Sequence, residues 1–98
     1  MKKYLLNGKL TAKTGYRDEL AAILIDASKL VSSAKGCQLY AVALSEHNTN
    51  DVFITEIWDS KQDHDNSLKL DGVKELIMKA MPILDGQPEK GQELEIIN

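Results

Sequence analysis

The side chains best suited to chemistry are Trp58 and His64, which lie six positions apart in the segment 53–64. The indole N–H of Trp58 can donate a hydrogen bond from the wall of an aromatic-binding cavity. An imidazole accepts protons near neutral pH, so His64 could take a proton from a phenolic substrate. Both residues also have plainer interpretations, which are favoured. Trp58 can be a core aromatic beside a helix, and His64 a surface residue between Asp63 and Asp65.

Three further polar residues in apolar strands extend this candidate site. Glu56 shares a strand face with Trp58, and an acid in a central strand must be paired or hydrated. Glu56 is either a pocket acid with a raised pKa or half of a structural ion pair, and the ion pair is favoured. Tyr40 could offer its hydroxyl to a ligand or only pack in the core. Asn7 could orient a substrate carbonyl, but its position parity favours hydrogen bonds across a dimer interface.

The rest of the sequence argues against several other classes of function. A formal net charge of -3 and scattered basic residues give no reason to expect nucleic acid as a partner. No apolar run approaches the roughly 20 residues that a membrane span needs. The single cysteine, Cys37, cannot form an internal disulfide, and a reducing cytoplasm is its simplest compartment. The acidic residues around His64 lack the spacing of a metal site, and no nucleotide-binding motif occurs, so neither a metal nor a cofactor is predicted.

Hydrophobic periodicity predicts the elements that would position these side chains. They are a strand at 4–12, a helix at 16–34, strands at 37–44 and 52–58, a helical region that starts at Ser60 and restarts at 71–72, and a strand at 92–97. Ser60 is expected to cap its helix, with Asp63 completing a capping box. Gly36 is expected to stop the first helix, and residues 85–91 to form a loop.

This order of elements predicts an α+β fold for one domain over residues 1–98. A ferredoxin-like split βαβ arrangement (βαββαβ), with one antiparallel sheet and both helices on one face, satisfies the connection rules with short loops. The two helices can cover only one sheet face, yet apolar residues alternate with Tyr40, Val42 and Leu44, so neither face is polar. Monomers rarely expose such a patch, so we expect a homodimer that packs through the open sheet face.

Three segments resemble, in their order and spacing, the antibiotic biosynthesis monooxygenase domain. They are Gly8-Lys-Leu-Thr-Ala-Lys-Thr-Gly15 with Arg-Asp-Glu-Leu shortly after it, Gly36-Cys-Gln-Leu-Tyr40, and Thr55-Glu-Ile-Trp-Asp-Ser-Lys61. The resemblance covers nearly the whole chain and implies a dimeric α+β barrel built from two ferredoxin-like sheets. It also implies a ligand cavity between the sheet and the helices of each subunit. The family includes cofactor-independent oxygenases of quinols or polycyclic aromatics, and haem-degrading enzymes.

The resemblance indicates where the working residues of relatives would fall. The tryptophan of the haem-degrading branch corresponds to Ser67 and its histidine ligand to Ile77, while its asparagine falls nearest Gly8, one residue from Asn7. Haem degradation is not expected, because no imidazole or thiolate stands where the haem iron would need it. Quinol-oxidising members often carry a histidine at the position that Ser67 occupies. His64 is therefore the remaining candidate base.

The expected function is that of a cofactor-independent monooxygenase that oxidises a small phenolic, quinol or other aromatic substrate with O2. The catalytic base would be His64, and the substrate-binding residues would be Trp58, Tyr40, Asn7, Ser67 and Ile77. The alternative is a non-catalytic dimeric protein that binds a small ligand or serves a stress response on the same scaffold. Isomerase or lyase chemistry is a weaker possibility, because one fold hosts several reactions.

Overall fold

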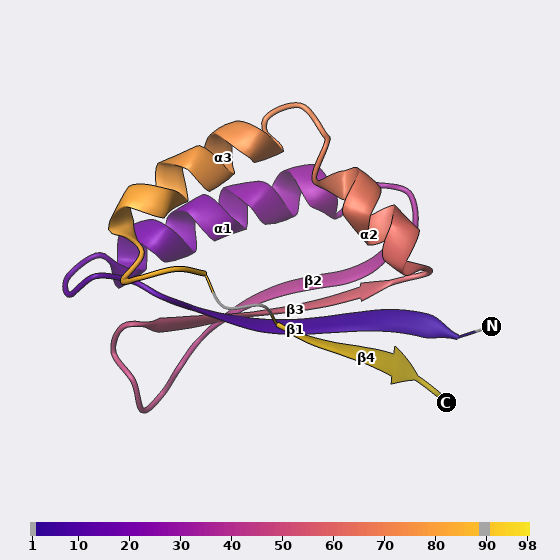
Figure 1. Ribbon diagram of the computed structural model, residues 1–98, viewed down its shortest axis with the longest axis horizontal. Helices are drawn as coiled ribbons and strands as arrows, with labels where there is room; N and C mark the ends of the chain where they lie inside the picture. The colour runs from indigo at the N-terminus through magenta and orange to yellow at the C-terminus, as the bar shows by residue number, and fades with distance from the viewer. Residues whose placement is uncertain (1, 89–90) are drawn as a thin grey trace.

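A computed structural model describes residues 2–88 and 91–98, which form a four-stranded antiparallel sheet with helices on one face (Figure 1). The strands are β1 (Lys3–Thr11), β2 (Cys37–Leu44), β3 (Asp51–Trp58) and β4 (Gln92–Ile96). The helices are α1 (Arg17–Val31), α2 (Lys61–Ser67) and α3 (Val73–Ala80), followed by the 3-10 helix η1 (Met81–Ile83). Residues 89 and 90 of the predicted loop at 85–91 lie outside the described residues.

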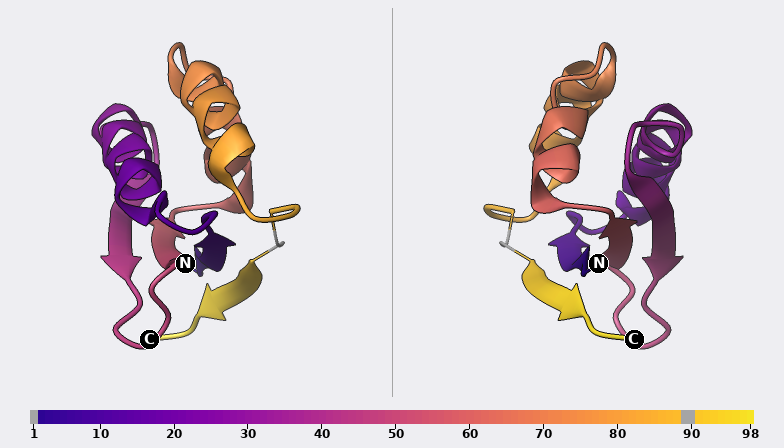
Figure 2. Two further views of the ribbon diagram at one scale, coloured as in Figure 1. Left: turned by 90° about the vertical axis from the view of Figure 1, so that its left-hand side faces the viewer. Right: turned by 90° about the vertical axis from the view of Figure 1, so that its right-hand side faces the viewer.

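The strand order β2-β3-β1-β4 confirms the predicted ferredoxin-like α+β fold. From the central strand β1 the chain passes through α1 to the edge strand β2, and a hairpin then leads to β3, which pairs with β1. The helix α1 is therefore the connection that crosses one face of the sheet. Figure 2 shows α1 and α3 side by side above the sheet, with α2 leading from the end of β3 into that layer. The predicted second helical region is therefore two helices, separated by a turn at 68–72.

Strand register gathers the polar candidates beneath the helices. Tyr4 lies opposite Trp58 in the β1–β3 pair, and Tyr40 lies opposite Glu56 in the β2–β3 pair. Side chains two apart along a strand share a face, so all four residues point to the same side of the sheet. Trp58 packs there against Val31 and Val73 of the helices, which identifies this face as the covered one.

Local signals set the ends of the helices. Ser60 Oγ accepts a hydrogen bond from the Asp63 backbone N–H at 3.1 Å, as predicted for the N-cap of α2. The helix α1 ends at Val31, earlier than the predicted 34, because the serines at 32 and 33 are poor helix formers. Gly36 instead forms the turn into β2, with a φ of 83°, and a Cβ there would overlap the Asp63 side chain. Only glycine satisfies both conditions.

Two apolar clusters hold the layers together. The larger one is centred on Leu20 and Val52, which are both fully buried. The smaller one is built around Trp58, whose side chain has an exposed fraction of 0%. Trp58 is therefore a core residue, as its plainer interpretation predicted.

The other face of the sheet carries none of the described helices. It presents Leu5, Phe53 and Ile57 from the central strands, with Leu39 and Leu94 exposed on the edge strands. Apolar side chains therefore occur on this face in all four strands. Among the described residues, no helix has the length and apolar character that a membrane crossing requires.

Candidate active site

A cavity of about 210 Å³ lies between the sheet and the helices. Its walls are mostly aliphatic side chains of α1 and α3, such as Leu24 and Leu76. Of the described residues, only Tyr40, Glu56 and Ser67 bring a polar group to the lining. An apolar cavity of about 150 Å³ is enough to bind benzene, so this one has room for a small aromatic molecule.

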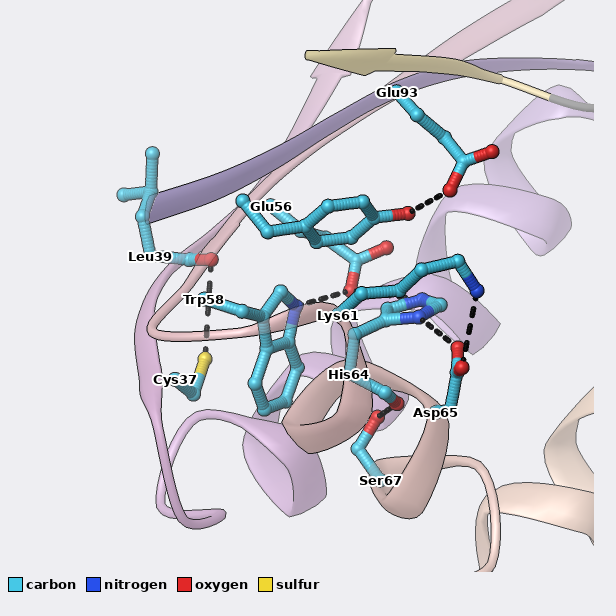
Figure 3. Close-up of polar contacts among 10 residues, drawn as sticks. Cys37, Leu39, Glu56, Trp58, Lys61, His64, Asp65, Ser67 and Glu93 are labelled. Carbon is cyan, nitrogen blue, oxygen red and sulfur yellow. Dashed lines mark hydrogen bonds and ion pairs between the residues drawn. The ribbon is translucent and has the colours of Figure 1, made fainter. Parts of the chain in front are cut away.

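Glu56 is the one carboxylate that lines this cavity among the described residues. Its Oε1 accepts a hydrogen bond from Trp58 Nε1 at 3.0 Å and lies 3.9 Å from His64 Nε2 (Figure 3). No described residue donates a hydrogen bond to its Oε2. Burial raises the pKa of the Glu56 carboxyl, while the Trp58 hydrogen bond and the nearby imidazole act in the opposite direction.

His64 lies beside the cavity and is absent from its lining. Its ring packs edge-on against Trp58 with centroids 5.9 Å apart, and at 5.6 Å from the ring of Tyr4. The Nδ1 atom lies 3.0 Å from Asp65 Oδ1, on the solvent side of α2. Lys61 Nζ binds the other oxygen of Asp65 at 3.0 Å. His64 is therefore a partly buried imidazole held between a cavity carboxylate and a surface carboxylate.

Tyr40 brings an available hydroxyl to the cavity. Its oxygen makes no hydrogen bond to any described residue, although the side chain is largely covered. Burial, and next the negative charge of Glu56, raises the pKa of Tyr40 well above its usual value. The group therefore stays a neutral phenol that can donate a hydrogen bond to a ligand. Ser67 differs, because its Oγ already donates to the His64 carbonyl at 2.6 Å.

Tyr4 and Cys37 complete the surroundings of Glu56. The Tyr4 hydroxyl donates to Glu93 Oε2 at 3.0 Å, and burial together with that carboxylate raises the pKa of Tyr4 to about 12. Burial, and then the charge of Glu56, also raises the pKa of the Cys37 thiol. Both side chains hold their protons at neutral pH. The described residues contain no group of three or more histidine, cysteine, aspartate or glutamate side chains that could hold a metal ion.

The predicted site residues fall into three groups. The cavity lining contains Tyr40, Ser67 and Ile77. Behind Glu56, outside the lining, lie Trp58 and His64. The open sheet face contains Asn7, which lies opposite Thr55 and Gln92 in the register of the sheet.

Glu56 was considered as a pocket acid from the sequence but was not named among the catalytic or substrate-binding residues. Its position two residues before Trp58 on one strand face was visible, but an ion pair was the favoured interpretation. The structure places its Oε1 atom 3.9 Å from His64 Nε2, a contact that is an ion pair only when the imidazole is protonated, and also gives it a place on the cavity wall. A buried carboxylate needs a hydrogen-bond donor, and the indole N–H of Trp58, on the same strand face two residues later, could have been recognised as that donor.

The fold and the cavity define a small α+β ferredoxin-like protein with an apolar cavity between sheet and helices. The sequence profile of the antibiotic biosynthesis monooxygenase family matches residues 4–78. The chain therefore belongs to the antibiotic biosynthesis monooxygenase family, as its motifs predicted. No curated protein sequence matches the chain significantly.

Solved structures agree with this assignment. The chain is similar to a candidate antibiotic biosynthesis monooxygenase from Chloroflexus aurantiacus, with 34% identity, a TM-score of 0.86, and coverage of 98% of this chain and 94% of that one. A second such candidate, from Caulobacter crescentus, has 16% identity and a TM-score of 0.86, over 99% of this chain and 91% of that one. A Bacteroides thetaiotaomicron protein of unknown function has 14% identity and a TM-score of 0.83, over 97% and 98%. The last two likenesses concern the fold alone.

Proposed function

We propose that this protein is a cofactor-independent monooxygenase that oxidises a small phenol, quinol or related aromatic molecule with O2. The observation that carries the proposal is the apolar cavity whose wall holds one carboxylate, Glu56, and one available hydroxyl, Tyr40. An electron-rich phenol fits such a site, because its ring suits the aliphatic walls and its hydroxyl needs a partner that takes a proton. Membership of the monooxygenase family supports the same reaction class.

In the proposed reaction, Glu56 Oε2 removes the phenolic proton. Its pKa is raised by burial, which makes the carboxylate a stronger base, and a positioned base contributes about 10²–10⁴-fold. The electron-rich phenolate then reduces O2 itself. One oxygen atom forms a new bond to a ring carbon, and the other leaves as water with two hydrogens from the substrate. The substrate is the only reductant, so the balance requires no external electron donor.

The remaining residues would orient the substrate and exclude water. Tyr40 donates a hydrogen bond to the oxygen that becomes negative, an interaction that gains strength away from water. The aliphatic walls, including Ile77, would hold the ring in place, and Ser67 lines the cavity at the end of α2. Trp58 contributes through Glu56, because its hydrogen bond keeps the carboxylate in one orientation.

We also propose a homodimer that forms by sheet-to-sheet packing. The support is the open face, where Phe53 and Ile57 lie between exposed leucines on both edge strands. Asn7 lies in β1, one of the two central strands of that face, where its amide would meet the partner subunit. A cytoplasmic location, proposed from the unpaired Cys37, is compatible with this assembly.

Oxygen uptake tests the proposed function. Wild-type protein is incubated in air-saturated, chelator-treated buffer with naphthols, naphthohydroquinones and anthrones, and oxygen consumption is followed with an electrode. We expect uptake that Glu56→Gln lowers by at least about 10²-fold. Glu46→Gln, an exposed glutamate of the β2–β3 hairpin, serves as the matched control and should keep full activity. Binding of these compounds without any oxygen uptake would instead identify the alternative, a non-catalytic ligand-binding protein.

A further inference from the structure

We propose that His64 is a proton-transfer residue that carries the substrate proton from Glu56 in the cavity to Asp65 at the surface. This inference rests on the proposed function, because it describes how the cavity base would be reset after each turnover. It gives His64 a role that does not require contact with the substrate. It also gives Asp65 a role in the reaction, as the residue that accepts the proton at the surface.

The geometry of three consecutive groups supports this route. Glu56 Oε1 lies 3.9 Å from His64 Nε2, and His64 Nδ1 lies 3.0 Å from Asp65 Oδ1. The side chains of Glu56 and His64 are 11% and 13% exposed, whereas that of Asp65 is 49% exposed. The imidazole therefore bridges a buried carboxylate in the cavity and a carboxylate in water.

The protonation states along the route are suited to the transfer. Hydrogen bonds from His64 and Lys61 hold the pKa of Asp65 below its usual value, so Asp65 is an ionised acceptor. In a neutral imidazole the proton then sits on Nδ1, and the lone pair on Nε2 faces Glu56. The 3.9 Å gap is about 1 Å longer than a hydrogen bond, so the transfer requires the two side chains to approach each other by about that much. Such contacts often tighten only when the substrate is bound.

The other acidic groups around Glu56 cannot take its proton. Tyr40 from β2, Cys37 at the start of β2 and Tyr4 from β1 all have raised pKa values and are already protonated. Trp58 is a donor only. Of the described groups that face Glu56, His64 on α2 is the one with a basic nitrogen that can accept a proton.

The proton balance closes over one cycle. The phenolic proton moves to Glu56 Oε2. A neutral carboxyl accepts the Trp58 hydrogen bond more weakly than a carboxylate does, so the protonated group can rotate and present its proton to His64 Nε2. The resulting imidazolium releases its Nδ1 proton to Asp65 and hence to water. Glu56 is then ionised again, and tautomeric exchange with water restores the starting state of His64.

A first experiment needs no turnover. The ring nitrogens of His64 and His47 are followed by ¹⁵N NMR while 4-nitrophenol, an acidic phenol with a coloured anion, is added. In wild type, the bound phenol should ionise and the His64 ring should become protonated. In Glu56→Gln the phenol should stay neutral and the His64 ring unchanged, while His47, exposed in the β2–β3 hairpin, responds in neither protein. An unchanged His64 ring in wild type, an equal response in Glu56→Gln, or no phenol binding would overturn the inference.

A second experiment uses the oxygen-uptake assay with a substrate identified above. His64→Gln should lower kcat by about 10²-fold and leave KM nearly unchanged, because His64 is not part of the lining. Free imidazole should restore the rate of His64→Ala but not that of Glu56→Gln, which a merely structural role could not produce. A full rate in His64→Gln, or no rescue, contradicts the proposal. If wild type shows no uptake at all, the oxygenase proposal fails, and the NMR result alone decides the proton route.

Discussion

Replacing Trp58 with phenylalanine is expected to shift the pH at which the cavity base becomes active. Phenylalanine keeps much of the apolar contact but lacks the Nε1–H that donates to Glu56 Oε1 at 3.0 Å. A hydrogen bond to a charged group contributes about 1.5–3 kcal/mol. Because the Trp58 bond favours the ionised carboxylate, its loss raises the pKa of Glu56 further. At about 1.4 kcal/mol per pKa unit, the acidic limb of the activity profile should move up by about one to two pH units.

The same substitution should also destabilise the fold. The lost hydrogen bond and the smaller ring together should lower the free energy of unfolding by roughly 2–4 kcal/mol at neutral pH. In a domain of 98 residues, each kcal/mol lowers Tm by about 4–8 °C. Calorimetry measures this change, and the pH dependence of kcat/KM measures the shift of the acidic limb.

A double-mutant cycle separates the two effects of Trp58→Phe. The cycle combines Trp58→Phe with Glu56→Gln and compares free energies of unfolding. The amide oxygen of glutamine still accepts a hydrogen bond, so the coupling energy measures the part of the Trp58–Glu56 hydrogen bond that depends on the charge of the carboxylate. We expect a coupling of about 1 kcal/mol. The reasoning is refuted if the two substitutions add within about 0.5 kcal/mol, or if the acidic limb stays where it is in wild type.

Three further substitutions test other parts of the structure. Glu56→Gln should stabilise the fold at neutral pH: burial raises the folded pKa, so Glu56 contributes its stability below the unfolded pKa and loses it as the pH rises through the folded value. Urea unfolding between about pH 4 and 8 should therefore show a flatter profile for the variant. Gly36→Ala should lower the free energy of unfolding by about 1–2 kcal/mol because of its positive φ, and by a further amount because the new Cβ overlaps the Asp63 side chain. Gly15→Ala, at a φ of 87° with open space around it, should lower the free energy of unfolding by the backbone strain alone. Ile57→Lys on the open face should yield monomers in light scattering, and a dimer that persists would contradict sheet-to-sheet packing.

The strands and the residues that share each face of a strand were predictable, because successive side chains of a strand point to opposite faces. Leu6, Gly8 and Leu10 were thus placed on one face of the first strand, and Leu5 and Lys9 on the other. The N-cap at Ser60 was also predictable from the sequence, because its hydroxyl accepts a hydrogen bond from a backbone N–H only three residues away. Signals of this kind are local, so the sequence contains them in full.

The site was harder to predict because it depends on which helix face meets which strand. His64 was interpreted either as a base for the substrate or as a surface residue, and the turn of α2 directs its ring against Trp58 and Glu56. The break after Ser67 sends the chain into a second helix, which brings Ile77 over the cavity. Sequence spacing does not contain the angle between α2 and α3, so it could not assign these neighbours.

The hydrogen bond between Trp58 and Glu56 has a practical consequence for spectroscopy. The chain contains one tryptophan, so all of its indole fluorescence comes from a ring bonded to the cavity carboxylate. The His64 ring lies 5.9 Å away, close enough for a protonated imidazole to quench the emission. The intrinsic fluorescence of the unlabelled wild-type protein should therefore report changes in the charge of Glu56 and His64, and it can be followed in real time as ligands bind.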